Sequence, residues 1–386
     1  MEFENKIIYI ISYEDWGEML MSKHHYAIEL GKMGNKVYFI NHTDKRYRLK
    51  RGEIQVSETI YLNVWSVTHR ISYPYILKYK FKNIYNFLTR FHIKKLVKKI
   101  GEKPDIVWSF EMGNALPIKY FTDSNVKIYM PVDGPFGTVD EEKAIQKADI
   151  LISVTNKILE QYKKSGIPKL RINHGVSDVF ISGGITYQQK NPIKIGYSGS
   201  LVRSDLDIDS FTQIIESHPE KIFEFWGEYD FNKSNIHLPQ DVQQQTLKFI
   251  ESLKNYRNVI LHGPVNPIIL AAGLQKMDAL LISYNIRNDQ NHHKVLEYLG
   301  SGKVIVSSYM SSYYNEDPDL IEMVRNTHDN KDLQPIFNKV INNLSFYNSL
   351  ELQNKRLEFA KKFTYKNQII TIQNFLNKEI KYSTLN

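Results

Sequence analysis

The chain has 386 residues, of which 42% are hydrophobic and 12% aromatic, so it has enough apolar material for two domains with buried cores, and a disordered chain is excluded. It has no cysteine, so disulfides, thiolate metal sites and cysteine nucleophiles are excluded, and a reducing cytoplasm is the compartment we expect. The first apolar run extends only from Ile7 to Ile11, and no later run approaches the length of a membrane span, so we expect neither a signal peptide nor a spanning helix.

The start of the chain has a βαβ pattern. Apolar residues 7–11 and 37–40 predict buried parallel strands, and the residues between them have helical spacing. The loop at 12–19 follows the first strand, where open α/β sheets bind ligands, so Gly17 in the loop and His24 on the helix are candidates for contacting an acceptor. The loop lacks the G-x-G-x-x-G pattern, so a nicotinamide dinucleotide is not expected. A structural role is the alternative for His24.

The basic charge of the protein lies in one segment. The whole chain carries +8, yet residues 59–101 contain nine Lys or Arg side chains and no acid, so the remaining residues sum to −1. Aromatic side chains are interleaved with these cations, and residues 83–100 have the spacing of an amphipathic helix. This mixture suits an anionic membrane surface, which we expect residues 70–100 to contact. A basic helix packed on its own domain is the alternative, and no nucleic acid is expected because no known nucleic-acid module is visible.

Two acidic residues follow later strands of the first half. Glu111 comes after a predicted strand at 103–109, and Asp133 comes after one at 126–130. Both therefore lie at carboxyl ends of strands, where polar groups face a ligand, and both are acceptor-side candidates and candidate general bases. An Asp beside Gly and Pro is also a common turn former, which is the alternative for Asp133.

The strand and helix pattern restarts in the second half of the chain. A polar run at 182–191 is the best linker, and it is followed by predicted strands at 193–201, 223–227, 258–265 and 277–284. The first of these strands enters a turn at Gly199 and Ser200, which lets the backbone approach a phosphate closely, and Arg203 follows the turn as a cation.

Residues 291–308 are the segment around which the chain is organised. They predict a short helix with Asn291 as N-cap and Gly302 after its end, followed by a buried parallel strand. Apolar side chains of this helix face the sheet, and three polar ones gather on the other side, namely His293, Lys294 and Glu297. The Lys and the His, beside free N–H groups of a first turn, suit a diphosphate, and the Glu can accept hydrogen bonds from sugar or ribose hydroxyls. A solvated face with an ordinary Lys–Glu pair is the alternative.

This segment resembles the donor-binding motif of glycosyltransferases with the GT-B fold. The similarity is to the retaining branch, which has two Glu residues separated by seven positions, in a sequence of the type K-x-x-E-Y-x-x-x-G-K-x-V-V. Glu297 matches the second Glu, Lys294 matches the basic residue before it, and residues 302–306 match the turn into the next strand. The position of the first Glu is occupied by Asp289, which retains a carboxylate.

Other segments resemble the same glycosyltransferases. Residues 258–265 are similar to the strand whose end reads the nucleobase, which implies that His262 and Val265 line a base pocket. The resemblance implies an α/β protein of GT-B architecture, with two doubly wound Rossmann-like domains facing across a cleft. The domains implied are an N-terminal acceptor-binding domain over 1–185, a C-terminal donor-binding domain over 186–350, and a last helix over 351–386 that crosses back to the N-terminal domain.

The resemblance implies a hexosyltransferase that moves a sugar from a nucleoside diphosphate sugar to an acceptor hydroxyl with retention of configuration. Lys294 and Arg203 would offset the charge on the leaving diphosphate, and Glu297 would hold the ribose. Asp133 would be a third catalytic residue, and it or Glu111 would be the base if the configuration were inverted instead. No cofactor and no metal ion are expected, because cations and helix N-termini would do the work of a metal.

The basic segment adds an expectation about the acceptor and the location of the protein. The acceptor would be a lipid-linked or other membrane-associated glycan intermediate of surface polysaccharide synthesis, and the protein would be cytoplasmic and peripheral at the inner face of the membrane. Two other functions stay open. A nucleotide-sugar 2-epimerase of related fold would convert the donor with no acceptor present. A non-catalytic glycan-binding or lipid-binding protein would keep the basic segment and bind no donor.

Overall fold

The computed structural model describes residues 2–17, 20–44, 48–131, 144–185, 187–231, 240–285 and 292–383. The chain divides into two compact units, which we call unit 1 (residues 1–173 and 365–386) and unit 2 (residues 174–364). The sequence predicted the division at 185/186, so the boundary in the structure comes earlier and the polar run at 182–191 belongs to unit 2. The predicted final segment 351–386 is shared between the units, with its last helix in unit 1.

Unit 1 is built on one sheet, which has eight strands within the described residues. The strands are β1 (Ile7–Ile11), β2 (Lys36–Ile40), β3 (Ile54–Glu58), β4 (Val64–His69), β5 (Ile106–Ser109), β6 (Val126–Tyr129), β7 (Ile150–Ser153) and β8 (Lys169–Arg171). Their spatial order is β3-β4-β2-β1-β5-β6-β7-β8, and β3 runs antiparallel to β4 whereas the other pairs are parallel. The strands predicted from apolar runs in this half are confirmed.

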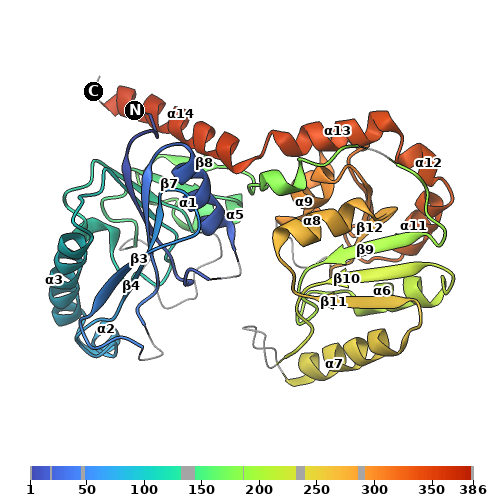
Figure 1. Ribbon diagram of the computed structural model, residues 1–386, viewed down its shortest axis with the longest axis horizontal. Coiled ribbons are helices and arrows are strands. Elements are labelled where there is room, and N and C mark those ends of the chain that lie inside the picture. Colours follow the sequence, from blue (N-terminus) through green and yellow to red (C-terminus); the bar gives the residue numbers. More distant parts are fainter. Residues whose placement is uncertain are drawn as a thin grey trace. The chain divides into compact units, whose positions relative to one another are not determined.

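Helices cover both faces of this sheet (Figure 1). Because successive side chains of a strand point to opposite faces, Ile8 and Ile10 pack on the side of α1 (Ser22–Lys32) and α14 (Tyr365–Ser383). Tyr9 and Ile11 pack on the other side, against α3 (Lys82–Ile100). Shorter helices complete the unit, namely α2 (Leu77–Lys80), η1 (Ile118–Tyr120) and α5 (Asn156–Gln161).

The hairpin formed by β3 and β4 was not predicted. Its first strand alternates a buried Ile54 with an exposed Gln55, which is the pattern of an edge strand with one face on the core. The alternation covers only the five residues of β3, which makes it a weak pattern in the sequence. The helical pattern at 83–100 is confirmed by α3, which ends before Gly101 with a φ of 86° at that glycine. Within the described residues, no helix combines the length and apolarity needed to cross a bilayer.

Unit 2 has a sheet of six strands among the residues described. They are β9 (Lys194–Ser198), β10 (Ile222–Trp226), β11 (Val259–Gly263), β12 (Ala279–Ile282), β13 (Val304–Ser307) and β14 (Glu322–Met323). The spatial order is β11-β10-β9-β12-β13-β14, and all these pairs are parallel. Counted within the unit this is the order 3-2-1-4-5-6 of the doubly wound dinucleotide-binding fold, whose ligands bind where the strand order reverses. That point lies between the carboxyl ends of β9 and β12.

Helices pack around the sheet of unit 2 (Figure 1). They are η2 (Asp178–Phe180), α6 (Ile208–Glu216), α7 (Gln240–Asn255), α8 (Pro267–Gln275), α9 (Lys294–Gly300), α10 (Ser311–Tyr314), α11 (Leu333–Ile341), α12 (Leu344–Tyr347) and α13 (Leu350–Lys361). The Asp207 carboxylate accepts the Ser210 N–H at 3.1 Å and opens α6. Gly302 follows the end of α9 with a φ of 74°, as predicted, and its predicted N-cap Asn291 lies outside the described residues.

Two buried histidines join the end of β4 to α3. The His69 Nε2 lies 3.1 Å from the Asn41 carbonyl oxygen, which can only accept, so this nitrogen carries the hydrogen. The His69 Nδ1 must then accept from the His92 Nε2 at 3.0 Å. Desolvation lowers the pKa of His69 to about 3 and that of His92 to about 4, and each ring also lies near a further titratable base. Both rings are therefore neutral at physiological pH.

We expect the free energy of unfolding to fall as the pH drops below about 6.5. Above that value His69 and His92 are neutral in both the folded and the unfolded state. Below it the unfolded chain binds protons at these two residues, whereas the folded rings stay neutral until about pH 4. The loss is about 1.4 kcal/mol per pH unit for each such histidine. Urea unfolding between pH 7 and pH 5 measures it. The variant His69→Gln keeps a donor and an acceptor but should lose one histidine's share of the slope, whereas His328→Gln, at an exposed site, should not.

Candidate functional site

Three glycines mark the carboxyl ends of neighbouring strands in unit 2. Gly199, Gly227 and Gly263 follow or end β9, β10 and β11, with φ values of 134°, 138° and 72° that side chains rarely adopt. The Gly199 N–H donates to the Trp226 carbonyl oxygen at 2.7 Å, and the Gly227 N–H donates to that of Gly263 at 2.9 Å. A Cβ on Gly227 would overlap the Gly199 carbonyl oxygen. The turns thus pack backbone against backbone and leave an edge without side chains beside the switch point.

Lys294, the first residue of α9, reaches this edge. Its side chain is 3% exposed, and its Nζ donates to the Tyr197 hydroxyl at 3.3 Å. The Nζ also lies 4.5 Å from the centroid of the Tyr197 ring and 5.2 Å from that of Tyr284, as a cation held over two aromatic faces. A Cβ on Gly199 would overlap this ammonium group. Among the described residues no carboxylate lies within ion-pair distance of Lys294, and its desolvation lowers its pKa.

Arg203 does not stand free beside Lys294. Its guanidinium donates from Nε and Nη2 to the two carboxylate oxygens of Asp205 at 2.7 Å and 2.5 Å, and it lies 5.1 Å from the centroid of the Tyr284 ring. Burial alone would raise the pKa of Asp205, but the guanidinium holds it below its usual range, so the pair is ionised. The charge of Arg203 is therefore partly offset by Asp205, and its guanidinium lies against the Tyr284 ring. Its predicted role of neutralising a diphosphate together with Lys294 stays a prediction.

Glu297 lies one turn along α9 from Lys294. Desolvation raises the pKa of its carboxyl to about 7, although the positive charge of Lys294 acts in the opposite direction. The next residue, Tyr298, fixes the helix to the sheet, because its hydroxyl accepts the Ser198 N–H at 2.5 Å. Helix α9 is thus anchored to the end of β9, the strand that leads into the turn at Gly199.

The variant Glu297→Gln should raise the melting temperature at pH 8 and have little effect at pH 5. A carboxyl whose folded pKa is raised stabilises the fold below its unfolded pKa, and this contribution is lost as the pH rises through about 7. Above that value the wild type holds a partly buried negative charge that the variant lacks. Differential scanning fluorimetry at the two pH values measures the difference. Equal shifts at both values would show that Glu297 is not perturbed.

Three histidines surround the entrance to α9. The His292 ring lies 4.2 Å from that of Tyr284, and the rings of His174 and His293 are 6.0 Å apart. Desolvation lowers the pKa of the buried His292 to about 3, and the positive charges of Lys294 and Arg203 act in the same direction. The pKa of His293 is lowered too, but its side chain is exposed to solvent. The His292 ring is therefore neutral, and it offers hydrogen-bonding nitrogen atoms close to Lys294 in the sequence without adding charge.

The other residues predicted for the donor site make contacts within the turn or on the sheet. The Ser200 hydroxyl accepts the Val202 N–H at 3.1 Å and stabilises the turn after Gly199. The His262 ring lies on a face of the sheet, stacked on Trp226 at 4.8 Å, and its Nε2 is 2.8 Å from the Glu224 Oε2. Val265 is half-buried against the core of unit 2. Asp289 lies outside the described residues.

The acceptor-side predictions fall in unit 1. His24 is fully buried, with Nδ1 accepting the Met21 N–H at 3.0 Å and Nε2 3.2 Å from the Asp15 carbonyl oxygen, so it holds the loop after β1. Glu111 is also buried, and its Oε2 accepts the Ala115 N–H at 2.6 Å. Its pKa is raised by desolvation, against the pull of Lys78. Gly17 is exposed, with no atom near its missing side chain. Asp133 lies in the part of the chain that is not described.

Several residues of the site were not predicted. Tyr197 is the last residue but one of β9, Tyr284 follows β12, and both supply the aromatic faces over which Lys294 lies. Gly227 and Gly263 make the same kind of turn as Gly199. The signal was present in each case, because a Gly or Tyr at the carboxyl end of a parallel strand faces the ligand edge of such a sheet.

No family model and no curated protein matches the chain. Solved structures do match over almost its whole length. A glycosyltransferase from Rickettsia africae has a TM-score of 0.66 and 12% identity, with 98% of this chain and 99% of that chain covered. Anabaena HepE in complex with UDP and glucose has a TM-score of 0.63 and 13% identity, with 96% and 99% covered. The lipopolysaccharide outer core galactosyltransferase WaaB has a TM-score of 0.61 and 15% identity, with 97% and 99% covered.

These matches extend over both units of the chain, because they cover 96% or more of it. The fold predicted from the resemblance of residues 291–308 and the segments before them is therefore confirmed at the level of architecture. Both the doubly wound strand order of unit 2 and the match over complete chains support this architecture. The protein is an α/β protein with the GT-B fold.

Proposed function

We propose that the protein is a glycosyltransferase that binds a nucleoside diphosphate sugar in unit 2. The observation that carries this proposal is Lys294, a buried ammonium group at the switch point of a doubly wound sheet with no carboxylate partner among the described residues. Burying a charge without a partner is costly, and an anionic ligand at this place would relieve the cost. The missing side chain of Gly199 lets the Lys294 ammonium group lie against the turn, so a diphosphate bound along this backbone would meet the charge. The fold, shared with glycosyltransferases, supports the proposal.

The proposed chemistry follows from the residues around this turn. Lys294 would offset the negative charge that develops on the leaving diphosphate, in a site where burial strengthens the interaction. Glu297 would accept hydrogen bonds from ribose hydroxyls. We propose retention of configuration, on the spacing of Asp289 and Glu297, and no metal or cofactor. An NMR spectrum of the product with an inverted linkage would remove the proposal of retention and bring forward Asp133 or Glu111 as the base.

A thermal-shift panel tests the donor site. UDP, GDP, CMP, ADP and dTDP are each added to the wild type and to a double variant, Lys294→Ala with Glu297→Ala. A ligand at a hundred times its dissociation constant adds about 2.7 kcal/mol of stability. One nucleotide should stabilise the wild type and lose this effect in the double variant. If none stabilises the wild type, the proposal of a nucleotide-sugar donor fails. Turnover of the donor without any acceptor would instead indicate a 2-epimerase.

We further propose that the acceptor is a membrane-associated glycan and that α3 contacts the membrane. Ile84, Phe87 and Phe91 share one side of α3 and are 51%, 62% and 54% exposed, opposite the buried Tyr85 and Leu96. Exposed apolar side chains in a row mark an interaction surface. The same side continues toward the end of the helix with exposed cations, namely Lys94, Lys98 and Lys99. Rings at headgroup level with cations beside them suit an anionic bilayer at the inner face of the membrane.

Replacing Phe87 and Phe91 by Ser together with charge reversal at Lys94 and Lys98 should reduce binding to anionic liposomes at least tenfold. Each cation near the surface contributes about 1 kcal/mol, and the two rings add apolar burial. Co-sedimentation with vesicles of phosphatidylcholine and phosphatidylglycerol measures this. A control with Lys157→Glu and Lys164→Glu, on another exposed part of unit 1, should bind as the wild type does. Unchanged binding of the α3 variant would remove the membrane proposal.

A further inference from the structure

We propose that a cavity in unit 1 binds a phosphate or diphosphate group of the acceptor, so that the acceptor is a glycan joined to its lipid through phosphate. The inference rests on the proposed function and adds a substrate class to it. The cavity has a volume of about 430 Å³, within the range of ligand sites. Its described lining includes Thr43, Asp44, Arg51, Arg70, Tyr73 and Tyr75.

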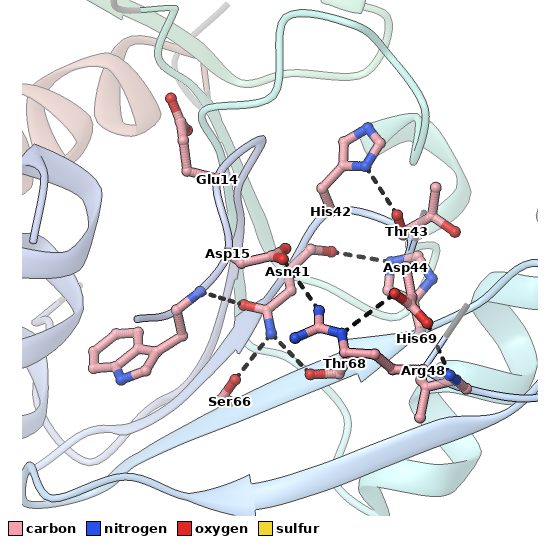
Figure 2. A network of polar contacts seen from close by, with 12 residues as sticks. Glu14, Asp15, Asn41, His42, Thr43, Asp44, Arg48, Ser66, Thr68 and His69 are labelled. Atoms are coloured by element: carbon pink, nitrogen blue, oxygen red, sulfur yellow. Dashed lines mark hydrogen bonds and ion pairs between the residues drawn. The ribbon is translucent and has the colours of Figure 1, made fainter. Parts of the chain in front are cut away.

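The cavity lies at the ligand edge of the sheet. Thr43 and Asp44 follow β2, and residues 70–75 follow β4, which is parallel to β2. The edge is held by the network in Figure 2, in which the Asn41 amide accepts the Trp16 N–H at 2.8 Å and donates to Ser66 at 3.0 Å and to Thr68 at 2.9 Å. Asn41 therefore ties the loop after β1 and the end of β2 to strand β4 beside the cavity.

The charges around the cavity favour an anion. Asp44 is the one acid among its described lining residues, and it is already engaged, since its Oδ1 lies 3.4 Å from the Arg48 Nε and its Oδ2 accepts the Leu49 N–H at 2.8 Å (Figure 2). Arg70 is held in place by donating from Nη1 to the Leu49 carbonyl oxygen at 2.7 Å. Arg51 is exposed and has no carboxylate within ion-pair distance among the described residues. The Arg51 guanidinium thus offers the forked donors that bind phosphate, and Arg70, held to Leu49, adds a second positive charge to the lining.

The surroundings point to a lipid source for that phosphate. The lining ends at Tyr75, and the next residue, Ile76, is 53% exposed. Tyr79 and Phe81, on α2 and directly after it, are 57% and 55% exposed, and the exposed row of α3 follows. A phosphate bound at Arg51 would thus lie beside apolar side chains suited to a hydrocarbon chain. A soluble phosphate would make no use of them.

Vesicle flotation tests the inference. Phosphatidylcholine vesicles containing a polyprenyl monophosphate are compared with vesicles of equal charge containing phosphatidylglycerol. The wild type should bind the first at least about tenfold more tightly, because charge-assisted hydrogen bonds to a phosphate monoester are gained. The variant Arg51→Glu should lose this preference. The matched control Arg171→Glu, an exposed arginine elsewhere in unit 1, should keep it.

Other outcomes overturn the inference. Equal binding to both kinds of vesicle, or a preference for polyprenyl monophosphate that persists in Arg51→Glu, shows that the cavity does not bind the phosphate group. If inorganic phosphate stabilises the wild type but not Arg51→Glu, while both kinds of vesicle are bound equally, the ligand of the cavity is a soluble phosphate. The proposal of a lipid-linked phosphate is then wrong. The donor site gives an independent readout. Nucleotide stabilisation that persists without the vesicle preference refutes this inference alone, whereas the preference without nucleotide stabilisation refutes the proposed function.

Discussion

Replacing Lys294 by Met should lower kcat by about a hundredfold to a thousandfold while leaving the protein as stable as before or more stable. The rate falls because one preorganised charge is removed from the place where negative charge develops on the diphosphate. The stability holds because Lys294 is 3% exposed, with no carboxylate partner among the described residues, so a thioether of similar length removes a buried charge and keeps its packing on Tyr197 and Tyr284.

Steady-state kinetics and urea unfolding of the same preparation measure the two effects. The exposed Lys276 of unit 2 provides the control, since Lys276→Met should change neither quantity. A Lys294→Met protein that loses both activity and stability would show that the ammonium group is part of the fold, and the donor site would have to be sought elsewhere. A protein that keeps both would show that the charge has no role.

The variant Gly227→Ala should remove nucleotide binding and lower the stability of unit 2 by about 3 kcal/mol. A φ of 138° strains any residue other than glycine, at about 1 to 3 kcal/mol, and the added methyl group would overlap the Gly199 carbonyl oxygen. That overlap displaces the turn after β9, which carries Gly199 against Lys294 and whose Gly199 N–H is bonded to Trp226, the residue before Gly227. The space for a diphosphate is therefore lost together with stability.

Calorimetric titration with the nucleotide from the thermal-shift panel, and urea unfolding, follow the two effects. Gly184→Ala is the matched control, because nothing lies within 4 Å of a Cβ at this position and its φ is not in the left-handed region. A Gly227→Ala protein with unchanged affinity would mean that the ligand does not approach the backbone at these turns.

The fold was accessible from the sequence because its signals are local. The apolar run that became β1 is short, rich in β-branched Ile and closed by a polar residue, and the run that became β12 is short and wholly apolar. The helix at 294–300 shows its buried face and its Gly302 stop directly. The hairpin of β3 and β4 was missed because one-sided alternation over five or six residues is a weak pattern. The unit boundary was misplaced because a polar run shows where the chain is exposed, not which core its neighbours join.

The site was accessible only in part, because its geometry depends on contacts between distant residues. Lys294 could be chosen from the helix pattern, but the absence of a carboxylate partner among the described residues could not. The pairing of Arg203 with Asp205 depends on the conformation of the turn between them. The placement of His262 against Glu224 depends on the register of β11 against β10, since a shift of one residue would turn its ring to the other face.

The most direct measurement is a crystal structure of the protein with the nucleoside diphosphate that the thermal-shift panel selects. The account predicts a phosphate oxygen within about 3 Å of the Lys294 Nζ, with the diphosphate against the backbone of Gly199 and Ser200 and the ribose at Glu297. A nucleotide bound elsewhere, or one in this place whose phosphates leave Lys294 without a contact, would contradict it.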